Sequence, residues 1–136
     1  MRKFDPASYT ALGISGNLTL EQDAAHVNLG GNWRMPTKDE WQELIDNCNV
    51  VWTKNYNRTG VAGRVFTSKI NGNSVFFPAA GSCYNSSVLY VGSYGYYWSA
   101  SWDSSSFAWY LCFDSGFQSL YYDYRYYGQP VRGVCK

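Results

Sequence analysis

Few residues in this 136-residue chain have the types and spacing that enzymatic chemistry requires. A catalytic site needs a nucleophile beside a base, a metal cluster, or a pair of carboxylates in a pocket. His26 is the single histidine, and we interpret it as a structural or surface residue. Asp39, Glu40 and Glu43 fall in the first turns of an expected helix, where carboxylates suit the helix dipole. We therefore expect no catalytic residues and no enzymatic activity.

The sequence also indicates neither a metal site nor a cofactor. Asp103, Asp114 and Asp123 are spread over expected loops and strand ends, and nothing around them resembles an EF-hand calcium loop. The chain has four cysteines without the C-x-x-C spacing of metal ligands: Cys48, Cys83, Cys112 and Cys135. We expect four free, mostly buried thiols. Two disulfides, with three possible pairings, remain the alternative.

Composition narrows the class of protein. Apolar residues make up 46% of the chain and charged residues 15%, which argues for a folded domain. The net charge is +1 without a basic cluster, so a nucleic-acid partner is not expected. Membrane insertion is not expected either, because no apolar run approaches the ~20 residues of a membrane span. The segment 1–10 lacks the apolar core of a signal peptide.

Two halves of the chain differ in composition. Residues 1–69 contain the helix-forming residues, Lys and Glu of an ordinary soluble domain, whereas residues 70–135 contain no Lys, Glu or Met. All but two of the 13 tyrosines lie in this second half, among runs of Ser, Asn and Gly. This asymmetry is the most informative feature of the sequence.

The first half contains two helix signals. Thr19, with Gln22 three residues later, forms a capping-box pattern for a helix over 20–29, which Gly30 ends. Thr37 and Glu40 form a second such pattern for a helix over 38–48. Apolar residues of the second helix recur on one face that should pack on a core: Trp41, Leu44, Ile45 and Cys48.

The second half is typical of short strands separated by turns. Segments 64–68 and 74–77 flank Asn71-Gly72, a hairpin signal, and further strands are expected in 93–101, in 107–113, in the tyrosine-rich run and in 129–135. In 107–113 the alternation places Trp109, Leu111 and Phe113 on the core face. Ala108, Tyr110, Cys112 and Asp114 then face solvent or a partner.

The tyrosine-rich run indicates a binding surface. Tyr supplies large, rigid contact area, and Ser, Gly and Asn supply adaptable hydrogen bonds, as in antibody paratopes. A strand buries at most alternate residues, so several rings of 121–127 should stay outside. The alternative is that these tyrosines fill a loop-rich core and only their hydroxyls reach water. The predicted ligand-binding residues are Asp103, Ser105, Ser106, Phe107, Tyr110, Cys112, Asp114, Phe117, Tyr121, Tyr122, Asp123, Tyr124, Tyr126 and Tyr127.

Four blocks carry a family resemblance: NWRMPTKDEW, NGNSVFFPAAG, GSYGYYWSAS and RYYGQPVRGV. In this order they resemble the C-type lectin-like domains of the Fibrobacter succinogenes major paralogous family. The resemblance implies an α+β fold in which two helices pack on a small twisted antiparallel sheet with long loops. It implies one domain over 1–136, with an N-terminal extension over 1–18 and a variable ligand-binding region over 98–127. The expected inward-facing scaffold is Trp33, Trp41, Leu44, Trp98, Trp109, Leu111 and Phe113.

Within that family, the second half resembles the variable proteins of diversity-generating retroelements. The resemblance implies a receptor-binding tip of a phage tail fibre or a bacterial surface adhesin, located on a virion or cell surface. It implies a cell-surface protein or glycan as the partner, and a homotrimer within a longer fibre or adhesin is one option. The alternative is a fixed-specificity carbohydrate- or protein-binding domain of a secreted Bacteroidetes surface protein. Calcium-dependent sugar binding is not implied, because Gln129-Pro130-Val131 lacks the required Asp.

Overall fold

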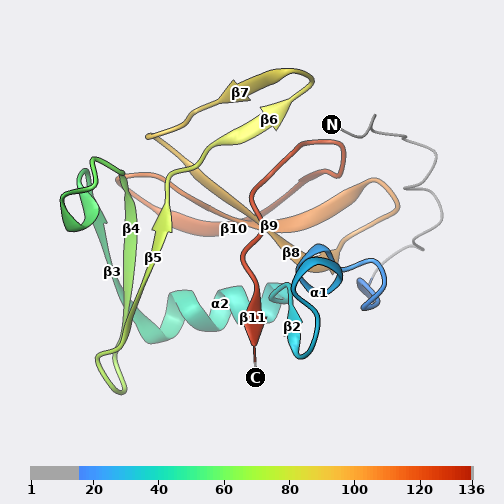
Figure 1. Cartoon of the computed structure of the whole chain (residues 1–136), viewed down its shortest axis with the longest axis horizontal. Helices are drawn as coiled ribbons and strands as arrows, with labels where there is room; N and C mark the ends of the chain where they lie inside the picture. The colour runs from blue at the N-terminus through green and yellow to red at the C-terminus, as the bar shows by residue number, and fades with distance from the viewer. Residues whose placement is uncertain (1–15, 136) are drawn as a thin grey trace.

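Strands dominate the computed structural model, which describes residues 16–135. Strand residues make up 44% of the described residues and helical residues 16%. The elements are β1 (Gly16–Asn17), α1 (Ala24–Leu29), β2 (Trp33–Arg34), α2 (Lys38–Asn47), β3 (Cys48–Thr53), the 3₁₀ turn η2 (Tyr56–Arg58), β4 (Gly63–Ser68), β5 (Ser74–Pro78), β6 (Ser82–Tyr84), β7 (Ser87–Leu89), β8 (Gly95–Trp102), β9 (Phe107–Phe113), β10 (Gln118–Tyr124) and β11 (Val134–Cys135) (Figure 1).

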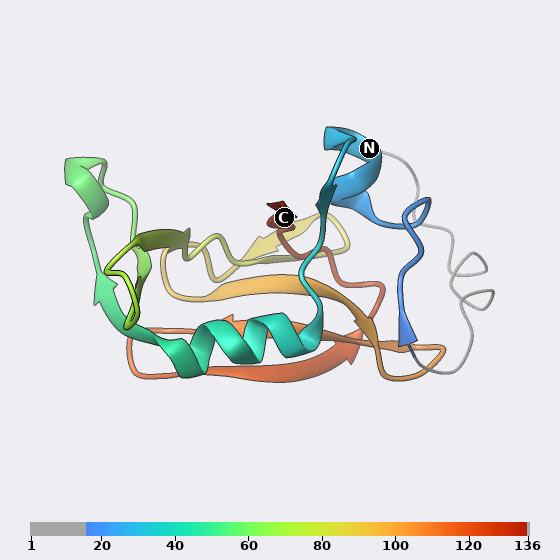
Figure 2. The same cartoon turned by 90° about the horizontal axis from the view of Figure 1, so that it is seen from below.

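The expected α+β architecture, with two helices packed on one small sheet, is wrong. The strands form four antiparallel sheets with the orders β1-β8-β9-β10, β3-β4-β5, β11-β2 and β6-β7. Helix α2 runs along one face of the four-stranded sheet (Figure 2). Helix α1 lies beside β2, and its Ala25 forms a small second core with Met35 and with Ala100 of β8. The fold is therefore mostly β, with one helix of more than two turns.

Helix α1 is short because its first turn begins later than the sequence indicated. Asp23, and not Thr19, caps the helix: its Oδ1 accepts hydrogen bonds from the backbone N of Ala25 at 2.9 Å and of His26 at 3.0 Å. Gln22 Oε1 instead accepts from Thr19 N within a separate turn. The predicted end at Gly30 is confirmed, since its N–H donates to His26 O at a φ of 68°.

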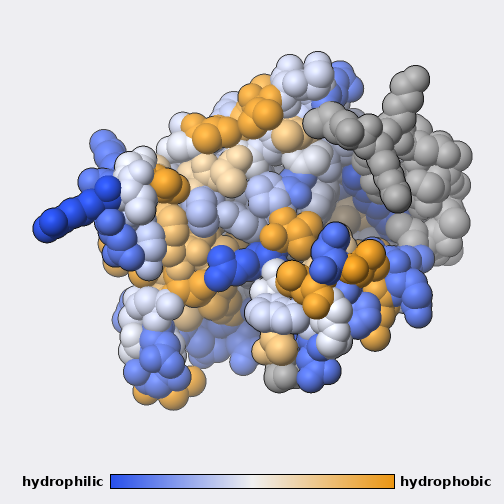
Figure 3. Space-filling model, viewed as in Figure 1, coloured by the Kyte–Doolittle hydropathy of each residue, from blue (hydrophilic) through white to orange (hydrophobic). Residues whose placement is uncertain are grey.

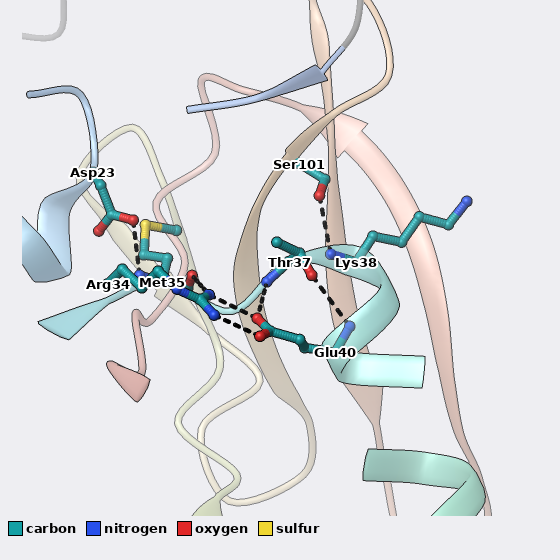
Figure 4. Close-up of polar contacts among 7 residues, drawn as sticks. All are labelled: Asp23, Arg34, Met35, Thr37, Lys38, Glu40 and Ser101. Carbon is teal, nitrogen blue, oxygen red and sulfur yellow. Dashed lines mark hydrogen bonds and ion pairs between the residues drawn. The ribbon is translucent and has the colours of Figure 1, made fainter. Parts of the chain in front are cut away.

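Helix α2 begins at the predicted capping box. Thr37 Oγ1 accepts from Glu40 N, and the Glu40 carboxylate accepts from Thr37 N at 2.9 Å. The same carboxylate accepts from both terminal nitrogens of Arg34, at 2.6 and 2.7 Å, and Lys38 N donates to Ser101 Oγ on β8 (Figure 4). The segment 33–40 thus fixes the start of α2 against the four-stranded sheet.

The main core lies between α2, the β3-β4-β5 sheet and the four-stranded sheet. Its rings meet edge to face, for example those of Trp41 and Phe77 at a centroid distance of 5.5 Å. Gly95 faces Phe113 across β8 and β9, and a Cβ added at Gly95 would overlap the Phe113 ring. The buried residues of this core are Trp41, Phe66, Phe77, Ala79, Tyr97, Leu111 and Phe113.

The predicted scaffold is confirmed in part. Trp41, Leu111 and Phe113 are fully buried, and Leu44, Trp98 and Trp109 are half-buried. Trp33 was expected inside but is 41% exposed. It lies on β2, which pairs only with β11 and stands away from the main core.

The strand predictions are confirmed in most segments, but the strand expected over 129–135 is limited to β11. The β4–β5 hairpin pairs Phe66 with Val75, and β9 has the predicted bounds. None of the four cysteines, all within the described residues, forms a disulfide. Only Cys112 is buried, so the expectation of mostly buried thiols is wrong.

Candidate functional site

The predicted ligand-binding residues divide between the two faces of the β9–β10 hairpin. Tyr121 lies opposite Tyr110 in the antiparallel register, and Tyr122 lies opposite Trp109. Directly opposed residues share a face, and successive residues alternate. The hairpin therefore carries two aromatic groups rather than the single surface that the sequence predicted.

One group is a continuous row of rings, here called the aromatic ladder. It runs from β9 and β10 through the segment after β10 to β6, with neighbouring ring centroids 4.4 to 5.8 Å apart. In order, its members are Trp109, Tyr122, Phe107, Tyr124, Tyr126, Tyr127 and Tyr84. The antiparallel bridge between Cys83 and Gly128 brings β6 beside this segment.

The outer tyrosine rings of the ladder are exposed, whereas the Trp109 ring at its inner end contacts Lys38 of α2. Tyr122 is 54% exposed, Tyr124 42% and Tyr126 45%. Among the described residues, no ladder tyrosine has a hydrogen bond from its hydroxyl. Lys38 Nζ sits 3.6 Å from the centroid of the Trp109 ring, a cation–π contact that closes the inner end of the row at α2.

Arg125 holds the loop beside the ladder. Its side chain is 7% exposed and donates to Phe107 O at 3.3 Å and to Ser104 O. Its backbone N also donates to Ser106 O at 3.0 Å. The loop that contains the exposed residues Asp103, Ser105 and Ser106 is thereby attached to the end of β10.

The other group, here called the opposite-face cluster, has a buried centre at Tyr110 and an exposed rim, where Tyr90 is 57% exposed, Tyr121 47% and Phe117 37%. Tyr110 and Cys112 were predicted to face outward, but they are 8% and 5% exposed. β9 is a central strand, and the rings of Tyr96 and Trp98 on β8 pack against Tyr110 at 5.9 and 5.7 Å. The cluster consists of Tyr90, Tyr94, Tyr96, Tyr110, Tyr121 and Phe117.

Burial also suppresses the ionisation of two side chains on this face of β9, Tyr110 and Cys112. It raises the pKa of the Cys112 thiol to about 12 and raises the pKa of the Tyr110 hydroxyl. A thiol with such a pKa is not a nucleophile at neutral pH. Cys112 is therefore a packing residue on β9, and the alternation in 107–113 did not separate buried from exposed side chains.

The remaining predicted site residues shape turns. Asp114 Oδ1 accepts from Gly116 N at 2.6 Å and from Phe117 N at 3.1 Å, which fixes the β9–β10 turn. Asp123 is half-buried, shares the face of Tyr121, and accepts from Tyr124 N. Within the described residues, no group of three or more His, Cys, Asp or Glu side chains has the geometry of a metal site.

Sequence reasoning missed three participants in the ladder. Trp109 was assigned wholly to the core, yet its ring forms the inner end of the row. Lys38 and Tyr84 were not considered. No local pattern signals them, because they reach the ladder only through α2 docking and the pairing of β6 with Gly128.

The fold and the site together define a small, mostly β domain that displays a row of exposed aromatic rings. Residues 47–134 match the family described as a domain of unknown function (DUF8237), and the chain belongs to that family. The matched region extends from the end of α2 to β11 and includes every ring of the ladder. No curated protein and no solved structure is significantly similar to the chain. No helix in residues 16–135 has the length and apolar character to cross a membrane.

Proposed function

We propose that the chain is a recognition domain and that the aromatic ladder binds a receptor or ligand on a cell surface. The observation that carries the proposal is the run of adjacent, exposed tyrosine rings whose hydroxyls lack partners among the described residues. Each covered aromatic side chain buries about 150–250 Å². The hydroxyls add hydrogen bonds at the rim of each ring, so one surface supplies both affinity and specificity.

Other exposed apolar residues support this role less well. Figure 3 shows apolar side chains gathered over the β6–β7 hairpin and around α1. These are mostly aliphatic residues, such as Val88 and Val91 near the hairpin and Val27 and Leu29 on α1. Aliphatic side chains provide no polar groups that would select a partner. Tyrosine is also enriched among the residues that dominate interface energies, whereas leucine and valine are under-represented.

The ladder can change its side chains without unfolding the domain. The ladder shares the face of β9 that carries Leu111 and Phe113, and these two residues are fully buried in the main core, whereas the outer tyrosine rings are exposed. Arg125 fixes the neighbouring loop through backbone carbonyls, which are present whatever the side chains of that loop are. Affinity and stability therefore rest on different residues.

Binding of labelled protein to a panel of bacterial cells tests the proposal. We expect saturable binding to at least one strain, and at least ten-fold weaker binding after the double change Tyr122→Ser and Tyr124→Ser. Tyr121→Ser is the matched control, because Tyr121 is 47% exposed but lies on the opposite face. Equal losses in both variants, or binding to no strain, would contradict the proposal.

A diversified version of this surface extends the proposal. The ladder residues Phe107, Tyr122, Tyr124, Tyr126 and Tyr127 are all types that adenine mutagenesis of Asn codons can produce, whereas the Trp at 109 is not. A retroelement would then vary the outer rings above a constant Trp109, on a phage tail fibre or a bacterial adhesin. Sequencing of the flanking DNA tests this version. A near-identical template repeat with adenines at these codons supports it, and its absence favours a fixed-specificity binding domain.

A further inference from the structure

A cleft of about 510 Å³ lies at the opposite end of the β9–β10 hairpin from the outer rings of the ladder. It is bounded by β3 and the residues after it, by the β7–β8 connection, and by the β9–β10 turn, which meet at one end of the molecule (Figure 1). Its volume falls within the range of about 300–1,000 Å³ typical of small-molecule sites. The side chains that matter here are Trp52, Lys54, Ser93, Tyr94, Asp114 and Ser115.

The walls of the cleft are fixed to one another. Arg64 lies opposite Trp52 in the β3–β4 register, is 5% exposed, and donates from Nε to Asp114 O at 2.7 Å. It also donates from Nη1 to Gln118 Oε1 at 2.7 Å, so β4 holds the start of β10. Tyr94 stacks on Tyr96 with an interplanar angle of 18°. A ligand would therefore enter a largely preformed site, which limits the entropy lost on binding.

Most polar groups of the cleft keep donors or acceptors that no described protein group uses. Among residues 16–135, neither Lys54 nor Asp114 forms an ion pair, and the hydroxyls of Ser93 and Ser115 have no hydrogen bond. Asp114 uses Oδ1 for its own turn and leaves Oδ2 available. Lys54 and Asp114 give the lining of the cleft one cationic and one anionic side chain, and the Arg64 guanidinium interacts electrostatically with Asp114. The two serine hydroxyls can each donate and accept.

We propose that this cleft binds a neutral pyranose unit of a glycan. An aromatic ring matches the apolar C–H face of a sugar, while its hydroxyls need donors and acceptors together. Trp52 and Tyr94 supply the aromatic walls, Lys54 donates, Asp114 accepts, and the serines do both. A simple anion would meet the like charge of Asp114, and a zwitterion such as phosphocholine has no hydroxyl that can donate to the serines and to Asp114. The site contains no ladder residue, so it is distinct from the proposed receptor surface.

Titration of ¹⁵N-labelled protein tests this site with four probes: the methyl glycosides of glucose, galactose, mannose and N-acetylglucosamine. We expect at least one probe to shift the amide signals of residues 52–54, 93–94 and 114–115 in a saturable way. The dissociation constant should be in the millimolar range, since one sugar makes few contacts. No saturable shift with any probe would overturn the proposal. Stronger shifts of the same signals by phosphocholine or glycine betaine would also overturn it, in favour of a zwitterion site.

Four variants make the test specific. Asp114→Asn keeps a side-chain oxygen that can accept from the turn amides and removes the charge, and Lys54→Met removes the donor. Each change should weaken binding at least ten-fold. Asp103→Asn is the matched control, because it is the same chemical change on the exposed loop at the other end of β9. The control should bind as the unchanged protein does. Loss of binding in the control, or full binding in both cleft variants, would contradict the assignment.

Tyr122→Ser should also leave sugar binding unchanged, so failure of this proposal and failure of the ladder proposal are distinguishable.

Discussion

Tyr121 and Tyr122 are adjacent in the sequence, but their rings lie on opposite faces of β10. Tyr122 contacts the rings of Trp109 and Phe107 at centroid distances of 5.2 and 5.8 Å. Tyr121 instead lies 6.4 Å from Tyr110 and from Phe117. The tyrosine-rich run is therefore not one surface. It supplies outer rings to the ladder on one side and helps to cover the central strand on the other.

Changing a ladder ring should have little effect on stability. Tyr122→Ser removes an exposed ring, and we expect the free energy of unfolding to fall by less than about 1 kcal/mol. Phe113→Ala removes a fully buried ring and should cost about 3–5 kcal/mol. Urea denaturation followed by tryptophan fluorescence measures both. A loss from Tyr122→Ser as large as that from Phe113→Ala would mean that the ladder is part of the core.

Removal of the Arg125 side chain should loosen the 103–106 loop. Arg125→Met leaves the carbonyl of Ser104 without its donor, at a cost of about 1–3 kcal/mol, whereas Phe107 O keeps its hydrogen bonds from the backbone N of Asp103 and Ser104. Hydrogen exchange should become faster for the amides of 103–107, and the exchange rates of other amides should change less. Arg58→Met, at an exposed arginine, is the control and should leave the loop unchanged. Unaltered exchange in Arg125→Met would exclude the anchoring role.

A methyl group at Gly95 should disrupt the packing of β8 on β9. Its Cβ would overlap the Phe113 ring, which is fully buried and has no room to move. We expect Gly95→Ala to lower the free energy of unfolding by about 2 kcal/mol or more. Gly116→Ala is the matched control, because its Cβ would meet only Asp114 Oδ1 at 3.5 Å. Similar thermal midpoints for the two variants would refute this packing.

Alkaline pH should destabilise the fold through buried tyrosine. Burial raises the pKa of Tyr97 to about 12, and its hydroxyl donates to Pro78 O at 2.7 Å. Unfolded tyrosine titrates near about pH 10, so this stabilising contribution is complete below that pH and is lost as the pH rises toward about 12. Urea midpoints at several pH values from about 8 to about 11.5 measure the loss. Tyr97→Phe should lose less stability over this range than the unchanged protein, and an equal loss would contradict the assignment to Tyr97.

Local patterns in the sequence predicted local structure well. The Thr37–Glu40 capping box, the β4–β5 hairpin and the bounds of β9 are all confirmed, because each depends on residues close in sequence. α1 began late because the Asp23 carboxylate also accepts from Met35 N at 2.8 Å, a contact that the segment alone does not reveal. Asp23, whose carboxylate also binds the distant backbone N of Met35, therefore caps α1 in place of Thr19.

The features that the sequence did not predict depend on packing between segments that are distant in the sequence. The alternation in β9 correctly placed Leu111 and Phe113 inside, but it wrongly exposed Tyr110 and Cys112, because β9 is covered on both faces. Division of the strands into four sheets also depends on pairings between distant segments, such as β1 with β8 and β2 with β11. The predicted site residues were assigned by residue type, and only the register of β9 and β10 separates them by face.

Footprinting of the tyrosines in the bound state tests the central claim most directly. The protein is oxidised by hydroxyl radicals, free and bound to receptor-bearing cells, and the modification of each tyrosine is measured by mass spectrometry. Binding should protect Tyr122, Tyr124 and Tyr126 and leave Tyr121 as reactive as in the free protein. Protection of Tyr121 with unchanged reactivity along the ladder would show that the partner binds elsewhere.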